Sequence, residues 1–319
     1  MKTKFIICLG ALLGVAAVAV RKQFELPKVR VNVHVADEAG HPVSGALVRF
    51  VFGKSRDANA IVRVEGNTSS SGAFTGEGHT GGSFGASVEK AGYYWSGLAI
   101  PPLEEIVHGR SQTVEGKAIM RPVGRPIPLF AKRVTIEIPV AGQPCGYDLE
   151  KGDWVAPHGL GVFSDFVFTL DRRYATRDDF DVRLNVRFSR ISDGIQEVRL
   201  PEEWRLSHFR WPREAPEQGY EPVLVSRLAR SQQGGTKASA TEDQAYFFRV
   251  RTVERDGQVV SAHYGKISGG LILGPSNSAT CLVRLTYYLN PAAMDRNLEW
   301  DTKRNLLSGL KDEEMPRQP

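Results

Sequence analysis

Apolar side chains occur at every second position along much of this chain, and this alternation constrains the fold more than any other feature. The clearest run is Asp181–Phe188, in which apolar residues alternate with Asp, Arg and Asn. A strand with this pattern packs one face on a core and leaves the other in water. The same pattern recurs at 31–35, 46–50, 134–138, 166–170, 246–250 and 281–289. Because long helical periods are missing, the sequence predicts an all-β fold: two antiparallel β-sandwich domains in tandem after an N-terminal signal segment.

The N-terminus has the features of an export signal. Met1–Lys4 carries two lysines, and Phe5–Val20 follows without a charged residue. This apolar run has the length of a signal-peptide core and is short for a bilayer span. Its small residues predict cleavage after Ala19, which makes 1–19 a signal peptide, whereas the two basic residues that follow leave an uncleaved signal anchor open. Either way, the sequence predicts a secreted, periplasmic or cell-envelope protein.

A proline-rich segment divides the remaining chain. Arg121–Pro128 contains three prolines, and such a segment cannot pair continuously in a sheet. We therefore expect one β sandwich over 28–122 and a second, of unknown function, over 130–290. A polar C-terminal tail is expected over 291–319, where the alternation stops.

Four short stretches of the first domain form a recognisable pattern. They are Val31–Val35, Asp37–Val48, Gly72–Phe74 and Val88–Tyr93. In the second stretch, a tight turn of Asp and Gly precedes a proline that directs the chain back into the sheet. Residues 28–122 thereby resemble the carboxypeptidase regulatory-like domain, a transthyretin-like β sandwich. The resemblance implies a non-catalytic accessory domain of secreted and surface proteins, and it implies no functional residues.

Charge argues against one class of partner. The chain has 41 basic and 36 acidic residues, a net charge of +5 that is spread along its length. Nucleic-acid proteins and polybasic membrane anchors concentrate their positive charge. The sequence therefore predicts no nucleic-acid partner and membrane contact only through an uncleaved signal anchor. A glycan or an envelope protein remains as the expected partner.

Two cysteines remain after cleavage of the signal. Cys145 follows the first expected strand of the second domain, and Cys281 lies in the last one. An oxidising compartment permits them to pair, and closing so long a loop stabilises a fold by about 2–5 kcal/mol. The alternative is two buried thiols. Both readings stay open at the level of sequence.

A glycine-rich loop between two expected strands gathers the most functional side chains. These candidate binding residues are Asp148, Asp153, Trp154, His158 and Asp165. The three carboxylates offer the oxygen ligands that calcium prefers, and the indole offers a surface for a sugar ring. The alternative is a structural loop whose aspartates cap turns and whose tryptophan fills the core. The spacing matches no EF-hand or repeat calcium loop, so no resident cofactor or metal is assigned.

Catalytic patterns are missing from the sequence. The seven histidines are scattered singly, without the spacing of a zinc site, and the Gly-x-Ser-x-Gly nucleophile motif does not occur. No catalytic residue is therefore predicted. The first hypothesis is an exported, non-catalytic binding or envelope-structural protein.

Two alternatives place the site in the second domain. One is a carbohydrate-active hydrolase, which needs two carboxyl groups at a defined separation across a cleft. The acidic residues available for it are Asp148, Asp153, Asp165, Glu202 and Glu203. The other is a carbohydrate-binding protein that uses Trp154, Trp204 or Trp211 as a platform. A pocket with convergent carboxylates would favour the enzyme, and a flat aromatic strip would favour binding.

Overall fold

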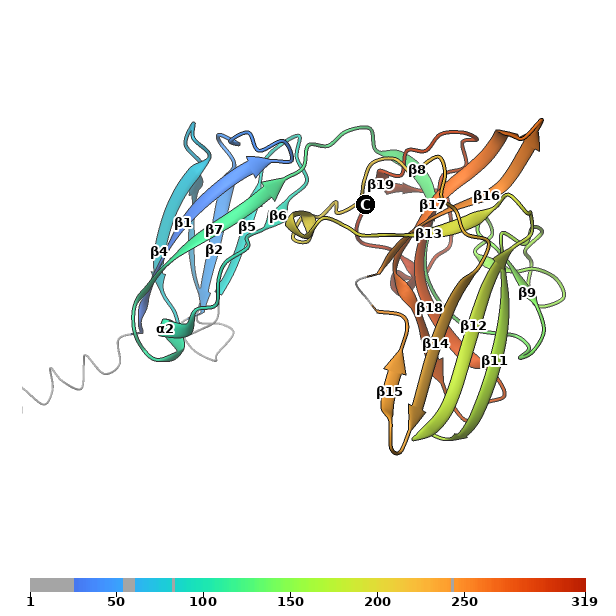
Figure 1. Cartoon of the computed structure of the whole chain (residues 1–319). Coiled ribbons are helices and arrows are strands. Elements are labelled where there is room, and N and C mark those ends of the chain that lie inside the picture. Colours follow the sequence, from blue (N-terminus) through green and yellow to red (C-terminus); the bar gives the residue numbers. More distant parts are fainter. Residues whose placement is uncertain (1–25, 54–60, 82–83, 242–243) are drawn as a thin grey trace, which may run out of the picture. The chain divides into compact units, whose positions relative to one another are not determined.

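The computed structural model describes residues 26–53, 61–81, 84–241 and 244–319. The predicted signal segment at 1–19 lies outside these residues. The chain divides into two compact units (Figure 1). Unit 1 runs to Val123 and also includes Leu206–His208, whereas unit 2 comprises Gly124–Arg205 and Phe209–Pro319. The boundary at Val123 falls inside the proline-rich segment.

Unit 1 is a β sandwich of two sheets. The first sheet has the strand order β4-β1-β7, with β1 and β7 parallel, and the second has the order β3-β2-β5-β6. The strands are β1 (Lys28–Asp37), β2 (Leu47–Gly53), β3 (Ile61–Asn67), β4 (Ala73–His79), β5 (Phe84–Glu89), β6 (Ser96–Gly97) and β7 (Gln112–Met120). One short helix, α2 (Glu104–Val107), precedes β7. Alternate residues of β1 and β2 point into the shared core, as their two-residue periodicity requires.

Unit 2 is a larger β sandwich built from two six-stranded sheets. One sheet has the order β10-β9-β11-β12-β14-β15. Its strands are β9 (Cys145–Asp148), β10 (Asp153–Trp154), β11 (Phe166–Thr176), β12 (Asp179–Phe188), β14 (Leu224–Ser231) and β15 (Gly235–Ala238). The other sheet has the order β13-β16-β17-β18-β8-β19. Its strands are β8 (Ile127–Glu137), β13 (Gly194–Val198), β16 (Ala245–Arg255), β17 (Gln258–Pro275), β18 (Cys281–Leu289) and β19 (Trp300–Asn305). Two 3-10 turns, η1 (Glu202–Trp204) and η2 (Asp312–Glu314), complete the unit.

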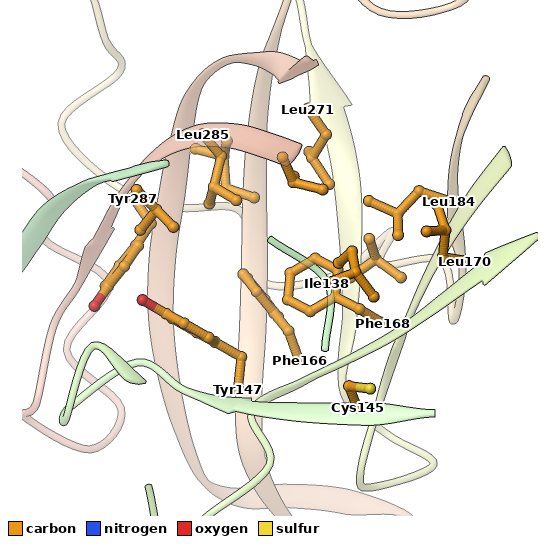
Figure 2. Packing of buried hydrophobic residues seen from close by; sticks show 14 of the residues in the cluster. Ile138, Cys145, Tyr147, Phe166, Phe168, Leu170, Leu184, Leu271, Leu285 and Tyr287 are labelled. Atoms are coloured by element: carbon orange, nitrogen blue, oxygen red, sulfur yellow. The ribbon is translucent and has the colours of Figure 1, made fainter. Parts of the chain in front are cut away.

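The core of unit 2 is rich in aromatic rings contributed by both sheets. Figure 2 shows Tyr147 of β9, Phe166 of β11 and Tyr287 of β18 directed toward one another. The Tyr147 and Tyr287 rings meet edge to face with their centroids 6.4 Å apart. Edge-to-face contact is a favoured geometry because the positive ring edge meets the negative ring face. The prediction of an all-β fold is confirmed.

The C-terminal segment differs from its prediction. Residues 291–319 were expected as a polar tail, but Leu298 and Trp300 are fully buried and β19 pairs with β8. Near the end of the chain, the hydroxyl of Tyr288 donates to the Gln318 carbonyl at 2.8 Å. The prediction was wrong because a strand with a single buried aromatic residue, flanked by charged residues, lacks the alternation that identifies longer strands.

None of the helices in the described residues is both long and apolar enough to span a bilayer.

Candidate functional site

The loop that follows β9 is organised by the carboxylate of Asp148. One oxygen, Oδ1, accepts backbone N–H bonds from Glu150 and Lys151 at 3.0 and 3.1 Å. The other oxygen, Oδ2, accepts from Val162 and Phe163 at 2.9 and 3.1 Å. Four donors on one carboxylate tie both ends of the loop together, and the side chain is almost completely buried. The residue therefore works as a loop clamp.

A buried ion pair lies next to this clamp. Arg251 of β16 donates from Nε and Nη2 to the two oxygens of Asp165 at 2.8 and 3.0 Å. Its Nη1 lies 2.5 Å from a carboxylate oxygen of Glu150, and its guanidinium covers the Phe163 ring at 4.9 Å. Two-pronged pairing of this kind is the strong geometry for an arginine. We name the group of Asp148, Glu150, Asp165 and Arg251 the carboxylate–arginine cluster.

The backbone at Arg251 is strained to make this pairing. Its φ is 56°, a left-handed value that side chains disfavour, and it lies where the register between β16 and β17 shifts. Such a conformation costs on the order of 1–3 kcal/mol and persists only where surrounding contacts hold it. The ion pair with Asp165 supplies those contacts.

Burial and neighbouring charges shift the pKa values of the residues in and beside this cluster in different directions. Burial would raise the pKa of Asp148, but its four backbone N–H bonds outweigh that effect and lower the pKa overall. At Asp165 burial prevails over the stabilising Arg251, so the pKa is raised. Burial, together with the positive charge of Arg251, lowers the pKa of His263, which lies beside Glu150. Three carboxylates thus share one guanidinium, and burial, backbone donors and the Arg251 charge set the direction of each pKa shift.

The other predicted site residues do not join this cluster. The carboxylate of Asp153 accepts from the backbone of Leu160 at 2.8 Å and closes its own turn. Trp154 is 8% exposed, and its ring meets Tyr147 and Phe168 edge to face in the core. His158 is exposed at the loop surface. The structure thus brings Asp148 and Asp165 together around Arg251. Asp153 is paired with Asp148 across β9 and β10, but its carboxylate accepts from the backbone of its own turn.

The calcium hypothesis finds no ligand set in this loop. Within the described residues, no group of three or more His, Cys, Asp or Glu side chains is placed to hold a metal ion. The physical reason is that the oxygens of Asp148 and Asp165 already accept backbone N–H groups and a guanidinium. The same burial keeps a substrate from reaching the two carboxyl groups. The alternative reading, a structural loop with a core tryptophan, describes what the structure contains.

Of the two alternatives for the cysteines, the structure contains the pair of buried thiols. Cys145 and Cys281 are both buried and carry free thiols, and both belong to the core of unit 2. The thiol of Cys145 lies 3.8 Å from the Val140 carbonyl, and that of Cys281 lies 3.3 Å from the Leu282 carbonyl. Burial raises the pKa of Cys281, which keeps it protonated and unreactive.

Unit 1 exposes an aromatic strip that the sequence analysis did not single out. The strip consists of Tyr93, Tyr94, Trp95 and His208. Trp95 is 50% exposed, and its indole stacks on the His208 ring with centroids 5.8 Å apart and an interplanar angle of 12°. An exposed tryptophan that is held by a stacked partner keeps a flat apolar face toward solvent.

Backbone pairing fixes the position of the strip. The Leu206–His208 segment of unit 1 lies along β6: the His208 N–H donates to the Trp95 carbonyl at 2.9 Å, and the Gly97 N–H donates to the Leu206 carbonyl at 2.8 Å. The strip borders an open hollow of about 770 Å³ that Glu89 and Lys90 also line. The ammonium of Lys90 donates to the Ser44 carbonyl and lies 5.5 Å from the centre of the Tyr93 ring. Aromatic faces and polar side chains thus meet around one hollow.

The two other tryptophans considered as platforms do not form one. Trp211 is 3% exposed and packs against Phe247, and Trp204 is half-buried in η1. The sequence did contain a signal for Trp95, because Tyr93, Tyr94 and Trp95 are consecutive. In extended backbone, three consecutive large side chains cannot all point to the same side. At least one of them had to face away from the core.

Comparisons with known proteins add little to this picture. No family model matches the chain, and no curated protein matches it either. Among solved structures, it is similar to a "putative carbohydrate binding protein" from Bacteroides uniformis ATCC 8492. That likeness has 9% identity and a TM-score of 0.20, and it covers 84% of this chain and 99% of the other. A score that low carries no argument, and the resemblance of residues 28–122 to the carboxypeptidase regulatory-like domain stays a prediction.

Proposed function

We propose that this chain is an exported, non-catalytic binding protein and that it binds carbohydrate on the aromatic strip of unit 1. The observation that carries the proposal is the half-exposed indole of Trp95, stacked on His208 beside an open hollow. Export is proposed from the N-terminal signal sequence, and an accessory role for unit 1 from its family resemblance.

The chemistry of the strip suits a sugar ring. A pyranose presents C–H groups on its faces and hydroxyl groups around its edge. The C–H face packs on an indole and removes apolar surface from water, while the hydroxyls need polar partners at the rim. Glu89 can accept and Lys90 can donate hydrogen bonds there. A hollow with these two features binds a sugar by stacking and orients it by hydrogen bonding.

Asp148 and Asp165 of unit 2 are not arranged for glycoside hydrolysis. Glycoside hydrolysis needs two carboxyl groups that face a substrate. Asp148 and Asp165 lie close to the same arginine, but both are buried and bonded to the loop that covers them. Their carboxylates stabilise the loop and do not face a cleft.

A glycan array probed with the purified protein tests the proposal. We expect binding to a subset of glycans, and we expect Trp95→Ala to weaken binding to the best of them at least tenfold by calorimetry. Trp95→Tyr, which keeps an aromatic face, should retain part of the affinity. Val107→Ala is the matched control because Val107 is a 77% exposed apolar residue of the same unit outside the strip. Unchanged binding by Trp95→Ala, or turnover of a bound glycan, would overturn the proposal.

A further inference from the structure

The outer face of one sheet in unit 2 carries a dense set of charges. Strands β11, β12 and β14 lie side by side, and their solvent-facing residues align in cross-strand rows. Asp171, Arg183 and Arg227 form one row, and Arg173 and Asp181 lie in the next. These five residues line an open hollow of about 660 Å³ on the sheet face. The hollow lies in a different unit from the aromatic strip.

Most charges on this face are already paired. Arg227 binds both oxygens of Asp181 at 2.9 and 2.5 Å, and Arg173 binds Asp179 at 2.9 Å. The carboxylate of Asp171 accepts from the Asn185 amide at 3.2 Å. Exposed ion pairs of this kind add little stability. Their main effect is to fix the positions of the side chains around the hollow.

Two arginines of β12 are the exception. Within the described part of the chain, Arg183 and Arg187 form no ion pair with a carboxylate, and both are exposed. They lie four residues apart on the same face of the strand, which places their Cα atoms about 13 Å apart. The face therefore presents two open guanidinium groups along a line, each able to bind an oxyanion with two hydrogen bonds.

We propose that this sheet face binds an acidic polysaccharide, with Arg183 and Arg187 contacting separate carboxylate groups of the chain. Charge supplies the first argument: within the described residues of this face, two exposed guanidinium groups lack an ion pair, against one carboxylate, that of Asp171. The second argument is the mixture of groups beside them. Asp171 and Asp181 can accept hydrogen bonds from sugar hydroxyls, which a polysaccharide carries on every unit and a DNA backbone lacks. A hydroxyl-rich polyanion therefore fits this face better than a nucleic acid does.

Affinity electrophoresis of the purified protein through gels that contain polygalacturonate tests this inference. Fully methyl-esterified polygalacturonate has the same backbone without the charge, so we expect retardation only by the acidic form. The retardation should weaken as salt is added, because exposed charges are screened. Equal retardation by both polymers would overturn the proposal, as would stronger retardation by duplex DNA of matched charge.

Variants locate the site. We expect Arg183→Gln to weaken retardation at least fivefold and the double variant with Arg187→Gln to abolish it. Arg255→Gln is the matched control, since it removes the same charge from an exposed arginine at the end of β16. If Arg255→Gln had the same effect as Arg183→Gln, the site would not lie on this face. Trp95→Ala should be retarded like the unmodified protein, which separates this site from the aromatic strip.

Discussion

The carboxylate–arginine cluster of unit 2 and the aromatic strip of unit 1 reverse the roles that their residue types suggest. Carboxylates and arginines usually face water, yet Asp165 is completely buried and holds a loop in place. Tryptophan usually fills a core, yet Trp95 is half-exposed. The loop after β9 is rich in residue types that often bind ligands, yet these residues stabilise the fold. The consecutive aromatic residues Tyr93–Trp95 instead provide an accessible surface. Accessibility distinguishes a binding residue from a structural one more reliably than residue type does.

The largest expected effect contrasts two tryptophans. Trp154→Ala removes a ring that packs against Tyr147 and Phe168, so it should lower the free energy of unfolding of unit 2 by about 3–5 kcal/mol. Trp95→Ala should change the stability of unit 1 by no more than about 0.5 kcal/mol, because the side chain is half-exposed. Urea denaturation followed by far-UV circular dichroism measures both. Similar losses in the two variants would remove the contrast between core and strip.

A smaller loss is expected from breaking the buried ion pair. Arg251→Met leaves the carboxylate of Asp165 buried without its partner, and the expected cost is about 3 kcal/mol in chemical denaturation. Arg255→Met, an exposed arginine of the same strand, is the control and should change little. Adding Asp165→Leu to Arg251→Met should restore part of the stability, since the double variant no longer buries that charge. A double variant less stable than Arg251→Met would contradict this account.

The smallest effect concerns pH. Because the pKa of Asp148 is lowered in the folded protein, its ionised form contributes stability above about pH 4, near the unfolded pKa. That contribution is lost as pH falls through the lower folded pKa. Asp148→Asn removes the charge that accepts four N–H bonds, so it should cost about 1.5 kcal/mol at pH 7.

Comparing the stability of Asp148→Asn with that of the unmodified protein at several pH values isolates the contribution of the Asp148 charge. The difference in stability between Asp148→Asn and the unmodified protein should shrink steadily between pH 4 and pH 2. Urea titrations at several pH values measure it. A difference that stays constant over that range would show that the carboxylate does not act through its charge.

Local patterns predicted the strands far better than they predicted the site. The all-β fold followed from alternation because a two-residue period places one face of each strand in the core. Runs such as that of β12 are long enough to be unmistakable. Strand β19 was missed because its one buried aromatic residue produces no period.

The site required long-range information. Arg251 lies 86 residues from Asp165, and the local sequence around either residue does not indicate that they form an ion pair. The calcium hypothesis finds no ligand set in the described residues for the same reason, since the sequence presents the carboxylates but not the backbone donors and the guanidinium that occupy them. The aromatic strip depends on Leu206–His208 pairing with β6, a contact between segments about a hundred residues apart.

The sequence by itself determined the secondary structure class, the proline-rich boundary near Val123 and the export signal that we propose for the N-terminus. Each of these is a local property, set by periodicity, backbone restriction or the composition of a short segment. The tertiary structure alone decided which carboxylates are buried, which tryptophan is accessible and which arginines of β12 remain without an ion pair. Those properties depend on neighbours that only folding brings together, because exposure and electrostatic environment belong to the packed chain and not to the residue.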